Sequence, residues 1–127
     1  MPTEDFWPSD LDKIELRTPL SILKEQASVL GAKTANAVIA EVTSKSEAGL
    51  FYHRLFLVVP VLDNYRYQLL TVNNGVKLYP LELKWAGRSY RCLDEADFKE
   101  RLKETLSSDE TRILLAALVA QAKADGS

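Results

Sequence analysis

The stretch from Leu50 to Val72 reads LFYHRLFLVVPVLDNYRYQLLTV, and its pattern decides the fold. The apolar run from Leu55 to Leu62 is rich in β-branched residues and is followed by Asp63-Asn64, which favours a strand that ends in a two-residue turn. We therefore predict a hairpin at the centre of a sheet. Pro60 cannot donate a hydrogen bond to a neighbouring strand, so a bulge or an unpaired stretch is expected near it.

A second hairpin is predicted around Asn73-Asn74-Gly75. If these residues form a three-residue loop with Gly75 in the left-handed conformation, Val72 lies opposite Val76. A two-residue turn would shift the pairing by one residue and place tyrosines beside charged side chains, so hydrophobic matching favours the longer loop. In that register both faces of the sheet are apolar. One face carries Leu55, Leu57, Val59, Val61, Leu70, Val72, Val76 and Leu78. The other carries Phe56, Val58, Tyr65, Tyr67, Leu69, Tyr79, Leu81, Leu83 and Trp85.

Helices are predicted on both sides of the strands in the sequence. Thr18-Pro19 provides a hydroxyl N-cap followed by proline at the first helical position, and Gly31 is placed to end this helix. Further along, Asp94 is suited to cap a helix that runs to Leu106. Ser107 has the capping-box spacing that starts another helix, and this last helix is apolar almost all the way round.

The predicted fold is an α+β domain with a four- to five-stranded antiparallel meander sheet, one N-terminal helix and two C-terminal helices. Residues 37–43 form the first strand, and a short segment at 89–93 would add the fifth. A chain of 127 residues is long enough for one packed core and too short for a second domain. Residues 1–9 are assigned to a flexible N-terminal tail, whose Phe6 and Trp7 could dock on the body, and residues 10–127 to a single α+β domain.

The composition is that of an ordinary globular protein, with 46% apolar and 27% charged residues. A formal net charge of −2 gives no bulk attraction to phosphate backbones or anionic membranes. The single cysteine, Cys92, excludes an internal disulfide and favours a reducing compartment. No apolar run approaches the roughly 18 residues of a transmembrane helix, and the first residues lack a signal-peptide pattern. A cytoplasmic protein that does not bind membranes is expected.

Catalytic signatures are absent from the sequence, which has no glycine-rich phosphate loop and no HExxH, CxxC or GxSxG motif. The only histidine, His53, lies among apolar residues at the start of the central strand, so we interpret it as structural, with a pKa below its usual value. One His and one Cys without clustered partners predict no metal site, and no cofactor is expected. An enzyme therefore ranks behind two binding functions.

The first binding function follows from a surplus of apolar surface. Three helices must cover two apolar faces, so either the helices divide between the faces or one face stays open for a partner. We predict a non-enzymatic protein–protein interaction module that forms a homodimer or docks on another protein. The expected interaction face consists of Leu55, Leu57, Val59, Leu70, Val72 and Leu78.

The alternative is a small binding domain for an anionic ligand at one edge of the sheet. Aromatic rings interleaved with basic side chains suit single-stranded nucleic acid or a phosphorylated metabolite, through stacking and phosphate contacts. Nucleic acid is not favoured, because acidic residues outnumber basic ones, 18 to 16. The candidate ligand-binding residues are Tyr65, Arg66, Tyr67, Lys84, Trp85, Arg88, Tyr90 and Arg91.

Overall fold

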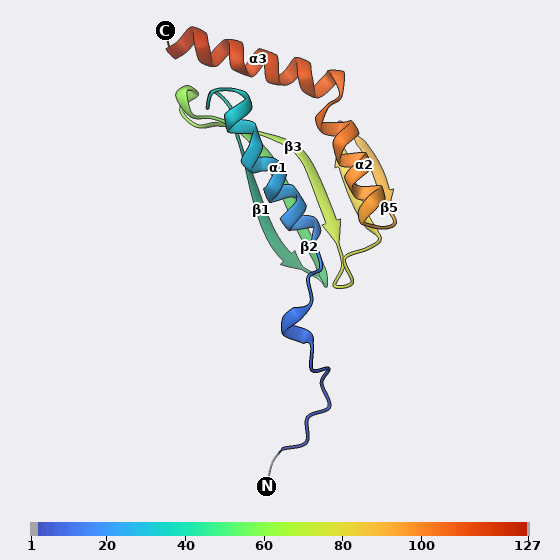
Figure 1. Ribbon diagram of the computed structural model, residues 1–127. Helices are drawn as coiled ribbons and strands as arrows, with labels where there is room; N and C mark the ends of the chain where they lie inside the picture. The colour runs from blue at the N-terminus through green and yellow to red at the C-terminus, as the bar shows by residue number, and fades with distance from the viewer. Residues whose placement is uncertain (1–2, 127) are drawn as a thin grey trace.

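The computed structural model describes residues 3–126, and the rest of the predicted tail and of the predicted domain lies outside these residues (Figure 1). Within them, five strands form one antiparallel sheet in the order β1-β2-β3-β4-β5. The strands are β1 (Ile39–Glu47), β2 (Leu50–Val59), β3 (Tyr65–Asn74), β4 (Leu81–Trp85) and β5 (Arg88–Cys92). The helices are α1 (Pro19–Lys33), α2 (Glu95–Leu106) and α3 (Asp109–Gly126). The predicted α+β meander, with one helix before the sheet and two after it, is confirmed.

The helix starts follow the capping signals in the sequence. The Thr18 hydroxyl oxygen accepts a hydrogen bond from the Ser21 backbone N–H at 3.0 Å, with Pro19 at the first helical position. The Asp94 carboxylate accepts one from the Asp97 N–H at 2.8 Å. Two boundaries differ from the prediction, because α1 continues past Gly31 to Lys33 and Ser108, rather than its neighbour, caps α3.

The central hairpin has a longer connection than predicted. Strand β2 ends at Val59, and the 3-10 turn η2 (Pro60–Leu62) follows it. Asp63 and Asn64 then adopt left-handed φ values of 56° and 55°. The unpaired stretch expected near Pro60 is confirmed, since a residue without an N–H cannot continue the ladder. The predicted two-residue turn is wrong, because the connection takes five residues, 60–64.

A β-bulge in β3 changes which side chains face the core. Leu55 pairs with Leu70, but Phe56 pairs with Gln68, so Leu69 is an extra residue in β3. Both Leu69 and Leu70 consequently belong to the hydrophobic core, although they are adjacent in the sequence.

The predicted register of the next hairpin is also wrong. Strand β3 continues through Asn74, which pairs with Leu81, and Val72 pairs with Leu83. Val76, the predicted partner of Val72, lies in the 75–80 loop and is 80% exposed. The register differs because the side chain of Asn74 is buried and hydrogen-bonds to His53. Strand β3 therefore continues into the residues that were predicted to form the loop.

The sheet therefore has one mainly apolar face, not two, and the helices pack on that side. Helix α1 packs on β1 and β2, α2 packs on β5, and α3 crosses one end of the sheet at η2 (Figure 1). The core lies between these helices and the sheet. The opposite face is mostly polar, as is common when one side of an antiparallel sheet meets solvent, although Tyr52, Phe56 and Val58 of β2 also lie on it. Its exposed side chains include Glu41, Thr43, Lys45, Arg54, Arg66, Gln68, Glu82, Lys84, Ser89 and Arg91.

Residues 3–17 form an arm that projects away from the body (Figure 1). Its regular structure is limited to one 3-10 turn, η1 (Leu11–Lys13), and every residue of the arm is exposed. Residues 10–17, which the sequence assigned to the domain, thus lie outside the packed core together with the tail. The arm carries several large apolar side chains in solvent, among them Trp7, which is 78% exposed.

The corrected register can be tested with two matched substitutions. Val72→Ala is expected to lower the free energy of unfolding by about 2 kcal/mol, because Val72 is fully buried and its loss leaves a cavity. Val76→Ala should change it by less than about 0.5 kcal/mol, because that side chain is 80% exposed. Urea unfolding followed by circular dichroism measures both. Equal losses for the two variants would contradict the pairing of β3 with β4.

Candidate interaction groove

A groove with a volume of about 700 Å³ lies between α1 and α2. The two helices pack over opposite edges of the sheet, so the sheet between them is only partly covered (Figure 1). Its floor is apolar and comes from Leu55 and Leu57 of β2 and Leu69 of β3. The bulge places Leu69 there, so the register of the sheet builds the floor. We call this feature the groove and define it by its floor, its walls and its charged rim.

The walls of the groove are the facing sides of the two helices. In α1, Ile22, Val29 and Leu30 are spaced seven and eight residues apart and so share one side of the helix. Leu102 and Leu106 form the wall on α2. Val29 is 41% exposed, so apolar surface at the mouth remains in contact with solvent. One end of the groove is closed by Ser107, Thr111 and Leu115.

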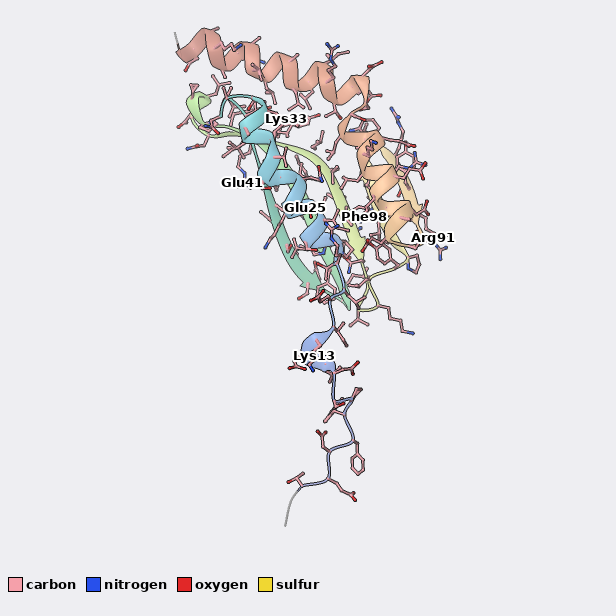
Figure 2. The ribbon with its side chains drawn as sticks, in the orientation of Figure 1. Lys13, Glu25, Lys33, Glu41, Arg91 and Phe98 are labelled. Atoms are coloured by element: carbon pink, nitrogen blue, oxygen red, sulfur yellow. The ribbon has the colours of Figure 1, made fainter. Side chains whose placement is uncertain are left out.

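The rim of the groove is predominantly basic. Arg17 forms an ion pair with Glu25, and Lys99 lies 2.9 Å from Glu95. The other charged residues of the rim are Lys33 and Lys103. Neither of these two lysines makes an ion pair within residues 3–126. Figure 2 shows Glu25 near the middle of α1 and Lys33 near its C-terminal end. Four basic groups and one acidic group therefore line the groove of a chain whose formal net charge is −2.

The predicted interaction face lies in the core and is not open to solvent. Five of its six residues are no more than 2% exposed within the single chain, and Leu78 is half-buried. The buried five are Leu55, Leu57, Val59, Leu70 and Val72. The helices cover this face because the bulge and the true register bring most of the large apolar groups to one side, while Phe56 and Val58 lie on the other. Leu55 and Leu57 contribute to the candidate binding site only because they line the floor of the groove.

The first part of the predicted aromatic-basic cluster divides between the two faces of the sheet. Tyr65 and Tyr67 point toward α3 and line a smaller cavity of about 280 Å³. Arg66 points the other way, where its guanidinium stacks 4.3 Å from the centre of the Phe56 ring and lies 3.5 Å from Glu41. These three neighbours in the sequence therefore do not form one site.

The second part of the cluster surrounds the turn between β4 and β5. Arg88 stacks 5.0 Å from the centre of the Trp85 ring and lies 2.6 Å from Glu110 of α3. The other aromatic ring of this part is covered, since Arg101 of α2 lies 4.2 Å from the centre of Tyr90. Lys84 and Arg91 lie on the polar face, where Lys84 is 3.3 Å from Glu82. Most basic groups of the cluster are thus engaged by carboxylates or rings of their own chain.

The buried side chain of His53 forms a polar network that links three strands. Its Nδ1 lies 2.7 Å from the Ser44 hydroxyl of β1, and its Nε2 lies 3.0 Å from Oδ1 of Asn74 in β3. The Asn74 amide nitrogen donates to the Gly75 carbonyl, so its Oδ1 faces His53 and accepts from Nε2–H. In the neutral imidazole, Nδ1 then accepts a hydrogen bond from the Ser44 hydroxyl. The sequence singled out His53 as a structural residue but did not predict its hydrogen-bond partners Ser44 and Asn74, since Asn74 was assigned to a loop.

A hydroxyl that donates to an oriented imidazole is also the arrangement that activates a serine nucleophile. Neither cavity found in the described part of the chain is lined by Ser44, His53 or Asn74. A nucleophile needs a substrate site beside it, so we interpret the network as a clamp that holds β1, β2 and β3 together.

Two further kinds of site were searched for in residues 3–126. No group of three or more His, Cys, Asp or Glu side chains is placed to hold a metal ion there. None of the helices in this part of the chain has the length and apolar character needed to cross a membrane. Cys92 is buried, and its burial raises the pKa of its thiol.

The His53 network makes stability depend on pH. Burial lowers the pKa of His53, the hydrogen bond that His53 donates to Asn74 partly offsets this effect, and the positive charge of Lys24 lowers the pKa further. The unfolded chain therefore takes up the proton first as pH falls below about 6.5. The free energy of unfolding should decrease from pH 7.5 to pH 5.5 by more in the wild type than in His53→Gln, whose side chain stays neutral. Urea unfolding at both pH values and an NMR titration of the ring measure this difference. A pKa above 6.5 would show a negative charge near His53 and contradict the clamp.

Comparison of the chain with protein-family models, with curated proteins and with solved structures gave no significant match.

Proposed function

We propose that the chain is a non-enzymatic protein–protein interaction module that binds an apolar segment of a partner in the groove between α1 and α2. The observation that supports this proposal is the apolar floor of Leu55, Leu57 and Leu69, over which the helices leave about 700 Å³ unfilled. Grooves between helices are common sites for amphipathic helices and extended peptides, which insert regularly spaced apolar side chains.

The dimensions of the groove suit a short peptide segment. Helix α1 has 15 residues and is therefore about 22 Å long. A segment of about seven extended residues, or a helix of about four turns, has that length. The exposed part of Val29 at the mouth would be covered by such a segment. A bound segment of this size removes from water the apolar surface that the helices leave uncovered.

The rim indicates the chemistry of the partner. Four basic groups surround an apolar floor, so a segment with apolar anchors and acidic flanking residues is complementary to the groove. Lys33 and Lys103 have no acidic partner in ion pairs within residues 3–126, which leaves them available to carboxylates of the bound segment. A basic segment would be repelled.

The aromatic-basic edge remains the alternative proposal, with single-stranded nucleic acid or a phosphorylated metabolite as ligand. Its support is the exposed side chain of Arg91 on the polar face of the sheet, which lies opposite Glu82 and diagonally from Lys84 in the next strand. We rank it second, because Arg66 and Arg88 are already occupied by Glu41 and Glu110.

The proposed function can be tested by selecting peptides on the protein itself. A library of random peptides displayed on phage should yield binders with apolar anchors and acidic flanks. Their binding should fall at least about tenfold with Val29→Arg, which places a charged side chain in the mouth of the groove. Val76→Arg is the matched control, since it adds the same charge at an exposed valine outside the groove. If Val29→Arg leaves the selected peptides bound, the groove is not the binding site.

A further inference from the structure

The arm formed by residues 3–17 exposes more apolar surface than its own chain covers. Phe6 is 88% exposed, Trp7 78% and Leu16 73%, and Leu11 and Ile14 are each about half exposed. Large apolar side chains gathered on one short segment mark a surface that is buried in an interaction. These five side chains are spread along the whole length of the arm, as the apolar anchors of a peptide that binds in a groove would be.

The charge of the arm is opposite to that of the groove. Between residues 3 and 16 the sequence TEDFWPSDLDKIEL has five acidic residues and one basic residue, Lys13. The groove has four basic groups and one acidic group in its lining. Apolar anchors flanked by carboxylates are the features that the groove requires of its occupant, so the chain contains both halves of a complementary pair.

The root of the arm directs it away from its own groove. Thr18 is extended, with φ −83° and ψ 156°, as expected for a residue that precedes proline. The ion pair between Arg17 and Glu25 fixes the arm at one end of the groove. To enter its own groove the chain would have to reverse direction within these few residues, whereas the structure shows it leaving the body (Figure 1). Figure 2 accordingly shows Lys13 well away from Glu25 and Lys33.

We infer that the groove binds the acidic arm of a second copy of this chain, and that two copies exchange arms to form a dimer. This inference rests on the groove function proposed above and identifies its occupant. Fourteen extended residues reach at most about 50 Å, which is enough to span the gap to a neighbour and the roughly 22 Å of its groove. In a two-fold arrangement each copy gives one arm and receives one, so both grooves are filled.

The test compares the full-length wild type with Phe6→Ser/Trp7→Ser by sedimentation equilibrium between 1 and about 100 μM. The wild type should be a dimer, and the double variant should raise the dimer Kd at least about tenfold with an unchanged circular dichroism spectrum. Both residues lie in the exposed arm, so folding is not affected by their replacement. A wild type that is monomeric at 100 μM, or a double variant that remains dimeric, overturns the arm exchange.

A charge reversal provides a second readout. Lys33→Glu/Lys103→Glu should weaken the dimer, and Glu4→Lys/Asp5→Lys should weaken it by a similar factor. Mixing these two variants should restore both exchanged contacts and give a heterodimer, because the basic arm meets the acidic groove and the wild-type acidic arm meets the wild-type basic groove. Absence of the heterodimer contradicts the pairing of arm with rim.

The peptide selection and the sedimentation test together distinguish failure of the arm exchange from failure of the proposed groove function. If phage-selected peptides bind in a Val29-dependent manner while the wild type stays monomeric, the groove function stands and the second copy is excluded as its occupant. If neither the peptides nor the arm bind, both proposals fail.

Discussion

The β-bulge at Leu69 is the feature on which the rest of the structure depends. In a regular strand Tyr67 and Leu70 would point to opposite faces, because side chains alternate. The extra residue lets both face the helices while Arg66 remains on the polar side. Two apolar faces would have required two covering layers, and a chain with three helices could not have supplied them well. One apolar face needs a single layer, and the helices provide it.

The groove follows from how that layer is placed. Helix α1 lies over β1 and β2 and α2 lies over β5, and these two helices touch each other at only a few positions. Elsewhere the side chains between them leave about 700 Å³ unfilled. Helix α3 does not fill this space, because it crosses the end of the sheet at η2. The groove is thus a consequence of a five-stranded sheet that is covered by two helices at its edges.

The sequence predicted what local signals encode and missed what depends on register. The capping residues Thr18 and Asp94 act through neighbours within four positions, so the helices could be located from the sequence. A bulge leaves no such signal, since Leu69-Leu70 reads equally well in either register. Asn74 also could not be placed from the sequence, because asparagine is a typical loop residue and its hydrogen bond with His53 appears only in the structure. The basic rim has a weak signal in Lys99 and Lys103, which are four residues apart on one side of α2.

In the proposed dimer, the separation of charge favours arm-to-groove contact over the alternatives. Residues 3–16 have five acidic residues and one basic residue, and the groove has four basic groups and one acidic group, so two arms would repel each other, two grooves would repel each other, and arm-to-groove contact would be attractive. Arg17 belongs both to the root of the arm and to the lining of the groove. A two-fold axis close to Arg17 would therefore bring each arm to the groove of the other copy. Such an arrangement would close on itself, whereas an arm attached far from its groove would favour open chains of molecules.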